Sequence, residues 1–182
     1  KHNLTLIATV AAILCGCNAN LDPQALVDGI IPAPREAEAL KGCFKLSGAT
    51  FECESALGGD AAAVVAEFAE RIGARAGSKR LVSFAKDASL PSEGYTVEVT
   101  KKGVKITAAD YNGVLYAIQT MKQMLPAKIY VPAVGNNFLL PCCRISDSPR
   151  FAYRGMHLDV CRHFFSVEEV KRYIDIIAVY KV

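Results

Sequence analysis

Apolar and polar residues alternate most regularly between residues 95 and 108. Every second residue is apolar from Tyr95 to Val99, and again from Val104 to Ala108. A period of two places such side chains on one face of a β-strand. Lys101–Gly103 separates the two runs and is typical of a tight turn. The pattern therefore predicts an antiparallel hairpin with one buried face and one face in water.

Two further stretches repeat their apolar residues at helical spacing. The first follows Asp60, a preferred helix N-cap residue, and ends before Gly73; the second follows Asp110 and ends at Pro126. Both stripes predict amphipathic helices that cover a sheet. Their apolar positions are Ala61, Val64, Val65, Phe68 and Ile72 in the first helix, and Val114, Leu115, Ile118, Met121 and Leu125 in the second.

Shorter signals surround these elements. Leu81–Ala85 predicts a strand, and Phe44–Glu54 predicts a strand or a hairpin that turns at Ser47–Gly48. Two prolines in Ile30–Arg35 predict an extended lead-in. Together the elements predict an α+β domain over residues 30–147, in which two helices cover one face of an antiparallel sheet.

The last part of the chain has a different pattern. Ser148–Pro149 marks a boundary, and Phe151–Val160 is a mostly apolar run that suits a strand buried on both faces of a parallel sheet. A loop over 161–165 leads to Ser166, which forms a capping box with Glu169. Apolar residues then recur at helical spacing (Val170, Ile174, Ile177 and Ala178), and Lys181–Val182 is expected to begin another strand. The stretch 148–182 thus predicts one strand–loop–helix unit.

Polar residues gather at one end of that unit. Asp159 and Arg162 lie at the end of the predicted strand and in the loop after it. In parallel α/β folds, ligands bind at this edge of the sheet. The five fixed donors of an arginine suit two adjacent hydroxyls or a carboxylate. The alternative is a surface arginine paired with Asp159 or Glu169.

The first residues have the character of a targeting segment. Residues 1–17 combine a short basic start with an apolar core too short to span a bilayer, and they end in Leu14–Cys17, which looks like a bacterial lipobox. Cys17 is then the expected lipidation site, and an ordinary cleaved signal peptide is the alternative. Residues 18–29 are interpreted as a tether. We therefore expect an exported bacterial lipoprotein in the periplasm or at the cell surface, anchored to a membrane by its lipid.

The composition of the chain bears on which partners and cofactors are expected. The net charge of +3 is small and its basic residues are scattered, so we expect no nucleic-acid partner. The three histidines lack the spacing of metal ligands, and we expect neither a metal nor a cofactor. Beyond the leader, the five cysteines are expected to be small buried hydrophobic residues. The alternative is a Cys43–Cys53 bridge across the hairpin.

Residues 154–164 read R-G-x-x-L-D-x-x-R-H-F. This resembles the first barrel strand of the β-N-acetylhexosaminidases, glycoside hydrolase family 20. The resemblance implies that 148–182 opens a (β/α)8 TIM barrel and that Arg162 grips hydroxyls of a terminal N-acetylhexosamine. Asp159 would support Arg162, His163 would face the pocket or pack beside it, and Arg154 would be structural.

The preceding region carries a second resemblance. Glu93–Pro126 is similar to the non-catalytic N-terminal domain of these enzymes, and Ile31–Pro34 matches its usual start. Related domains precede barrels in α-glucuronidases and O-GlcNAc hydrolases, so this part alone leaves the substrate open. A sister barrel glycosidase such as an α-glucuronidase, and a carbohydrate-binding lipoprotein module that does not cleave glycans, remain alternatives.

For the chemistry, the resemblance implies exo-acting removal of terminal N-acetylglucosamine or N-acetylgalactosamine with retention of configuration. The nucleophile would be the 2-acetamido oxygen of the substrate, an exception to the scheme with two carboxylates. The Asp-Glu pair that assists it lies on a later barrel strand in this family. No catalytic residue is therefore assigned here, and we expect this chain to be an N-terminal fragment that is inactive alone. A complete barrel takes roughly 250 residues.

Overall fold

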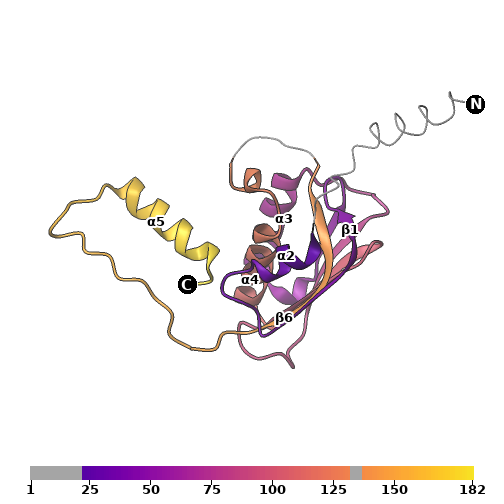
Figure 1. The fold of residues 1–182 in the computed structure, drawn as a ribbon, viewed down its shortest axis with the longest axis horizontal. Helices are drawn as coiled ribbons and strands as arrows, with labels where there is room; N and C mark the ends of the chain where they lie inside the picture. Colours follow the sequence, from indigo (N-terminus) through magenta and orange to yellow (C-terminus); the bar gives the residue numbers. More distant parts are fainter. Residues whose placement is uncertain (1–21, 132–136) are drawn as a thin grey trace, which may run out of the picture.

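The computed structural model describes residues 22–131 and 137–182. Its centre is a six-stranded sheet with the strand order β1-β6-β4-β5-β3-β2. Helices α3 and α4 lie side by side on one face of the sheet (Figure 1). The strands are β1 (Glu36–Lys45), β2 (Thr50–Cys53), β3 (Leu81–Lys86), β4 (Tyr95–Val99), β5 (Gly103–Ala108) and β6 (Leu139–Asp147); the helices are α2 (Pro23–Asp28), η1 (Ser55–Leu57), α3 (Gly59–Ile72), α4 (Tyr111–Gln123), η2 (Ala127–Tyr130) and α5 (Val167–Val179).

The strongest sequence patterns are confirmed. Strands β4 and β5 form the antiparallel hairpin, with Tyr95 opposite Ala108. Asp110 caps α4, because its Oδ1 accepts a hydrogen bond of 3.0 Å from the backbone N–H of Gly113. The α3 prediction needs one correction, since the N-cap residue is Gly58 and Asp60 lies within the first turn.

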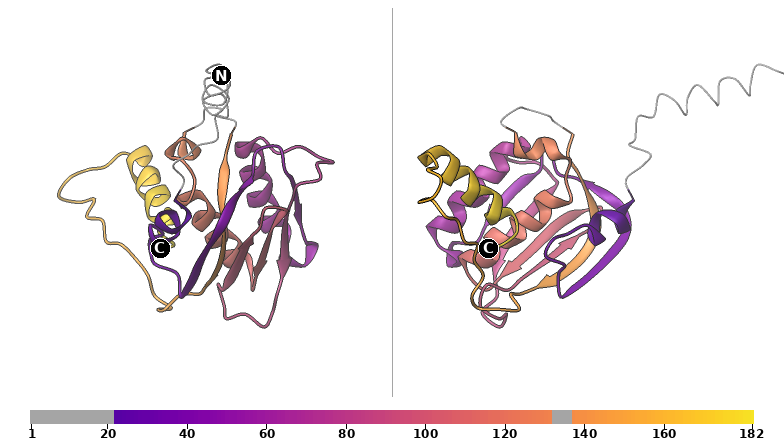
Figure 2. Two further views of the ribbon diagram at one scale, coloured as in Figure 1. Left: turned by 45° about the vertical axis from the view of Figure 1, so that its right-hand side comes forward. Right: turned by 60° about the vertical axis from the view of Figure 1, so that its left-hand side comes forward.

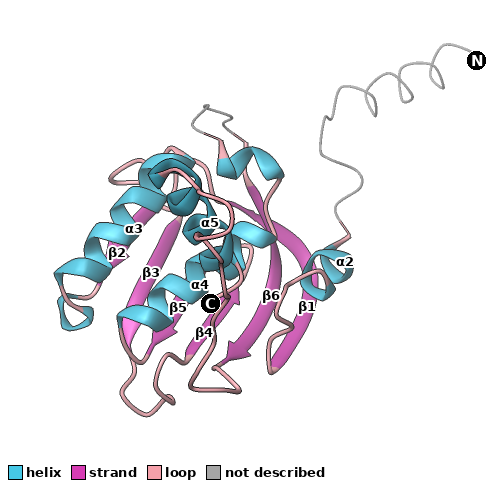
Figure 3. Cartoon of the chain, turned by 90° about the vertical axis from the view of Figure 1, so that its left-hand side faces the viewer, coloured by secondary structure: helices cyan, strands magenta, loops and turns pink. Residues whose placement is uncertain are grey.

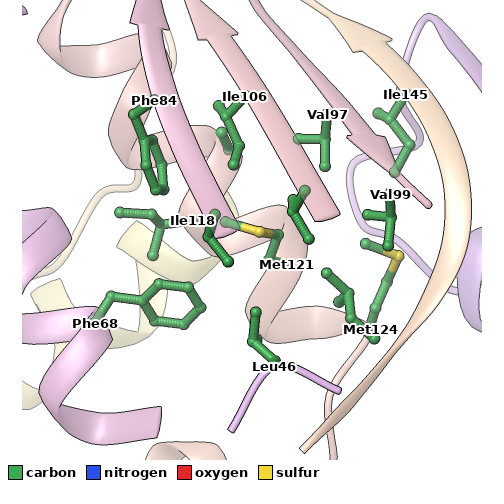
Figure 4. Close-up of a cluster of buried hydrophobic side chains, with 14 of the residues drawn as sticks. Leu46, Phe68, Phe84, Val97, Val99, Ile106, Ile118, Met121, Met124 and Ile145 are labelled. Carbon is green, nitrogen blue, oxygen red and sulfur yellow. The ribbon is translucent and has the colours of Figure 1, made fainter. Parts of the chain in front are cut away.

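The core fills the space between the two helices and the sheet (Figure 4). Met121 and Met124 are fully buried there, as core filler. The labelled side chains of this cluster are Leu46, Phe68, Phe84, Val97, Val99, Ile106, Ile118, Met121, Met124 and Ile145. The opposite face carries polar pairs such as Glu98 with Arg144, which explains the alternation in β4.

The sheet is mixed, whereas the sequence pattern predicted an antiparallel one. β2 pairs with β3, and β3 with β5, in parallel. Helix α3 connects β2 to β3 and returns the chain to the end at which β2 began, so that the next strand runs in the same direction. The alternation of apolar and polar residues indicates which face of a strand is buried, but it does not indicate whether neighbouring strands are parallel or antiparallel.

The stretch Phe44–Glu54, predicted as a strand or a hairpin, contains the end of β1 and all of β2, and the hairpin alternative is wrong. β1 pairs with β6 and β2 pairs with β3, at opposite edges of the sheet. The link between them is buried at Leu46 and fixed by Phe138, whose backbone N–H donates to Ser47 Oγ at 2.9 Å. Residues 46–49 therefore pack in the core and connect two strands at opposite edges of the sheet, and do not form a tight turn between paired strands.

The positions of the strands explain the burial of the cysteines and the absence of a Cys43–Cys53 bridge in the described residues. All five in the described residues are free thiols, so the alternative of a Cys43–Cys53 bridge is wrong. Cys142 and Cys143 on the interior strand β6 are buried, as predicted, whereas Cys43 and Cys53 are only partly buried. Cys161 is exposed, against the prediction, because it lies in a loop outside the core.

Regular structure begins nearer the N-terminus than the sequence analysis predicted. Part of the stretch interpreted as a tether, 18–29, is the helix α2, capped by Asp22 and packed against β1 through the buried Val27. A short helix with one apolar anchor lacks the long stripe that sequence analysis relies on. The predicted leader 1–17, Cys17 included, and residues 18–21 lie outside the described residues.

The C-terminal stretch forms a third layer. Figures 2 and 3 show α5 on the outer side of α4, with the sheet on the other side of α4. Helix α5 has the predicted Ser166–Glu169 capping box. The strand predicted over 151–160 is wrong for this chain: the segment is extended, and in the described residues it pairs with no strand. A strand needs a hydrogen-bonded neighbour, and this segment joins neither open edge of the sheet, at β1 or at β2. Lys181–Val182 forms a turn and terminus, not the predicted strand.

Candidate functional site

Asp159 organises the loop that carries the predicted sugar-binding arginine. Its Oδ1 accepts hydrogen bonds from the backbone N–H of Cys161 at 2.8 Å and of Arg162 at 3.2 Å. Its Oδ2 lies 3.2 Å from Arg162 Nη1. One carboxylate thus fixes both the turn and the guanidinium, by charge-assisted hydrogen bonds.

The guanidinium itself faces solvent. The Arg162 side chain is 88% exposed and that of Asp159 is 39% exposed. His163 and Phe164 are exposed beside it. An exposed ion pair of this kind adds little stability. The pair uses only part of the arginine's donors, and the structure brings Arg162, Asp159 and His163 together in one loop.

A second polar cluster lies where the C-terminal segment meets the domain. Arg154 Nη2 donates to Glu93 Oε2 at 2.6 Å and to the Tyr116 hydroxyl at 2.8 Å. Its Nε donates to the backbone carbonyl of Lys181 at 2.9 Å. Burial opposes the charge of Arg154, but the hydrogen bonds with Glu93 and Tyr116 outweigh burial and raise its pKa. Arg154 is therefore a cation that joins three separate parts of the chain.

Lys181 forms the neighbouring cluster. Its Nζ donates to the Tyr95 hydroxyl at 2.8 Å and lies 3.2 Å from Asp147 Oδ2. Tyr95 in turn donates to Asp147 Oδ2 at 2.9 Å. Burial lowers the pKa of Lys181, against the attraction of Asp147, and burial together with the Asp147 charge raises the pKa of Tyr95. Lys181, Tyr95 and Asp147 thus satisfy one another in surroundings of low polarity.

A pocket of about 290 Å³ lies beside the two clusters. Tyr95, Tyr116, Phe151, Arg154 and Lys181 are among the residues that line it. Arg154 and Lys181 at its wall each contact a carboxylate, whereas Arg150 donates to the backbone carbonyl of Ala33 at 3.2 Å.

Other site classes find little support in the described residues. In residues 22–131 and 137–182, histidine, cysteine, aspartate and glutamate side chains nowhere gather in a group of three or more that could hold a metal ion. Among the helices that the structure describes, none combines the length and apolar character needed to cross a bilayer.

Two models of known families match the chain. The model described as glycosyl hydrolase family 20, domain 2, matches residues 28–148. The model described as glycosyl hydrolase family 20, catalytic domain, matches residues 151–182. The chain belongs to glycosyl hydrolase family 20. The predicted fold class is confirmed with it: an α+β N-terminal domain, here with a mixed sheet, followed by the start of the family 20 catalytic domain.

Two similar curated proteins are both named β-hexosaminidase. A β-hexosaminidase of Porphyromonas gingivalis is 44% identical over 102 residues, which are 53% of this chain and 13% of that protein. A β-hexosaminidase of Vibrio vulnificus is 30% identical over 164 residues, which are 89% of this chain and 18% of that protein. The chain therefore spans less than a fifth of the length of these two relatives.

Solved family 20 structures share the fold. The β-N-acetylhexosaminidase of Streptomyces coelicolor A3(2) superposes with a TM-score of 0.74 at 31% identity, over 85% of this chain and 33% of that one. An exo-β-N-acetylglucosaminidase of Vibrio harveyi, solved in complex with N-acetylglucosamine, gives 0.71 at 31% identity, over 86% and 24%.

Sequence reasoning singled out the Arg162 loop and missed the partners of the second cluster. Arg154 was expected to be structural, and its contacts join the domain residues Glu93 and Tyr116 to the backbone of Phe151 and Lys181 in the C-terminal stretch. Glu93 and Asp147 carried no signal, because their partners are distant in the chain. Lys181 was expected on a strand, and the turn that buries it leaves no local pattern.

Proposed function

We propose that the full-length protein is an exo-acting β-N-acetylhexosaminidase, which removes terminal N-acetylglucosamine or N-acetylgalactosamine. The observation that carries this proposal is the match of the family 20 catalytic-domain model to residues 151–182, which contain the whole R-G-x-x-L-D-x-x-R-H-F motif. The relatives named β-hexosaminidase and the solved relative with bound N-acetylglucosamine support the same substrate class.

Arg162 is the residue proposed to bind the sugar. Its guanidinium is exposed and is oriented by Asp159, and donors that do not contact Asp159 are available to adjacent sugar hydroxyls. Asp159 supports the loop through the two backbone hydrogen bonds, and His163 flanks the arginine. The contact with Asp159 favours one orientation of the guanidinium, and such pre-orientation lowers the entropic cost of recognition.

Hydrolysis is proposed to proceed with retention, with the 2-acetamido oxygen of the substrate as nucleophile. The family 20 scheme then needs an acid for the leaving oxygen and an aspartate that orients the acetamido group. Glu168 and Glu169 do not suit these roles: Glu169 caps α5, and Glu168 pairs with Lys171 on its surface. The 182-residue chain alone is therefore proposed to be inactive.

The test uses the full-length gene product and 4-nitrophenyl glycosides. We expect hydrolysis of the N-acetyl-β-glucosaminide or N-acetyl-β-galactosaminide, with the β-anomer of the free sugar appearing first in the NMR spectrum. The β-glucoside, which lacks the acetamido nucleophile, should remain intact. Equal hydrolysis of the glucoside, or release of the α-anomer first, would contradict the mechanism. Binding of chitobiose without cleavage would indicate a carbohydrate-binding module, and cleavage of an α-glucuronide alone would indicate the sister family.

The cellular setting is a separate proposal that rests on the sequence of residues 1–17. We propose export and lipidation at Cys17, which would anchor the enzyme to a membrane surface. Growth with radiolabelled palmitate should label the parent protein and leave a Cys17→Ala variant unlabelled. Equal labelling of the two proteins would exclude Cys17 as the lipidation site.

A further inference from the structure

The segment that carries the Arg162 loop is attached to the N-terminal domain at both ends. Before the loop, Arg154 contacts Glu93 and Tyr116. After the loop and α5, Lys181 contacts Asp147 and Tyr95. The two attachments also contact each other, because Arg154 Nε donates to the carbonyl oxygen of Lys181 at 2.9 Å.

The attachments differ from the surface ion pairs of this chain in their burial. The side chains of Lys181 and Asp147 are 7% and 13% exposed, and those of Arg154 and Glu93 are 20% and 26% exposed. Loss of one partner from such a pair leaves a charge in surroundings that cannot solvate it. Breaking either of these pairs therefore costs more free energy than breaking an exposed surface pair.

Between the attachments the segment makes few contacts with the domain. Met156, Val160 and Phe164 are exposed, and α5 contains no buried residue. One hydrogen bond from Gln123 Nε2 to the Val179 carbonyl oxygen, 2.8 Å long, joins α4 to the end of α5. The domain thus acts on the position of the loop mainly through the ends of the segment.

We propose that Glu93 and Asp147, both in the non-catalytic domain, are positioning residues for the sugar-binding arginine. This inference rests on the proposed function, because it assigns them a role in the same reaction. They touch no sugar; they hold Arg154 and Lys181, and thereby the two ends of the segment from which Arg162 projects. The N-terminal domain then has a defined task, namely to fix the geometry of one substrate contact.

The test is a double-mutant cycle in the full-length protein. Glu93→Gln and Asp147→Asn are each combined with Arg162→Ala, and kcat and KM are measured on 4-nitrophenyl N-acetyl-β-glucosaminide. Each single variant is expected to lower kcat/KM roughly tenfold, since positioned groups lose efficiency with small displacements. In the Arg162→Ala background the same changes should lower it less than about twofold, because residues that act through one contact are not additive. Glu98→Gln is the matched control, as it breaks an exposed pair with Arg144 in the same domain.

The outcomes separate the two levels of the proposal. An active parent whose Glu93→Gln and Arg162→Ala losses simply multiply overturns the positioning role and leaves the proposed function intact. An active parent with unchanged kinetics in Glu93→Gln and Asp147→Asn does the same. A parent without hydrolytic activity overturns the proposed function itself, before any variant is made. If Glu93→Gln does not fold, Glu93→Asp keeps the charge with a shorter reach, and its loss must still vanish in the Arg162→Ala background.

Discussion

Replacement of Asp147 by asparagine tests whether burial makes the Lys181 attachment strong. Asp147 accepts hydrogen bonds on both oxygens: Oδ1 from the backbone N–H of Arg35 at 3.2 Å, and Oδ2 from Tyr95 and Lys181. An asparagine has one oxygen for these two sides, so its NH2 group must face a donor on one of them. The Lys181 ammonium then has no carboxylate partner. Either it stays buried at a cost in free energy, or the lysine leaves the site and becomes solvated.

The magnitude follows from the geometry. Removal of one partner from a buried ion pair costs about 3 kcal/mol or more, which corresponds to a roughly 150-fold change in an equilibrium constant. Release of Lys181 detaches α5, and an isolated helix of 13 residues is marginal in water. Detachment should therefore appear as unfolding of α5, while α4 stays protected by the core.

Hydrogen–deuterium exchange of the 182-residue chain measures this directly. Peptides from 167–179 should exchange roughly 100-fold faster in Asp147→Asn than in the parent, and peptides from 111–123 should change much less. Glu168→Gln is the matched control, because the Lys171–Glu168 pair has the same 3.2 Å separation but side chains that are 65% and 82% exposed. It should change exchange by less than about threefold. Equal effects of the two substitutions would refute the argument from burial.

The pH dependence adds a second readout to this variant. The pKa of Lys181 is lowered from 10.5, first by burial, and the attraction of Asp147 opposes that shift. Without the Asp147 charge, the pKa falls further. The folded protein then loses this proton at a lower pH than the unfolded chain, so stability rises with pH from the lowered pKa up to 10.5. The difference in α5 protection between parent and variant should shrink from pH 7 to pH 10, and a difference that grows over this range would contradict the assignment.

Two further predictions concern the domain itself. Asp110→Ala should lower the free energy of unfolding by about 1–2 kcal/mol in urea titrations, because the N-cap hydrogen bond of α4 is lost; a change below about 0.3 kcal/mol would indicate that the cap contributes nothing. In the folded chain, iodoacetamide should label the exposed Cys161 first and leave Cys143 unmodified, since Cys143 is buried and burial raises the pKa of its thiol to about 12. Labelling of Cys143 at the rate of Cys161 would contradict the buried position of β6.

The elements that sequence reasoning predicted correctly are those whose signals are local. The β4–β5 hairpin has its alternation and its turn within one stretch, and α4 and α5 each carry a cap beside an apolar stripe. Their existence depends on neighbours a few residues apart. The same holds for the Arg162 loop, where Asp159 contacts groups two and three residues later.

The features that could not be predicted depend on distant partners. β6 was not predicted: its pairing with β1 and β4 depends on residues distant in the chain, and it contains Pro141, a residue that central strands disfavour. The ladder between β6 and β4 begins only at Cys143, and a register shift in β1 lies opposite, so the missing N–H of Pro141 falls where the ladder on one side has ended. The strand predicted over 151–160 has an apolar pattern but finds no neighbouring strand in the described residues. The Glu93–Arg154 and Asp147–Lys181 pairs likewise join residues far apart in the chain.

The central claim is that Arg162 binds the terminal sugar in a family 20 enzyme, and kcat/KM of Arg162→Ala in the full-length protein tests it most directly. Hydrogen bonds to a charged group contribute about 1.5–3 kcal/mol each. Loss of two such bonds to sugar hydroxyls should therefore lower kcat/KM on 4-nitrophenyl N-acetyl-β-glucosaminide by roughly 100-fold or more. The matched control is Arg172→Ala, which removes the same side chain from an exposed position on α5 and should leave kcat/KM within about twofold. An Arg162→Ala enzyme as active as the Arg172→Ala enzyme would contradict the account.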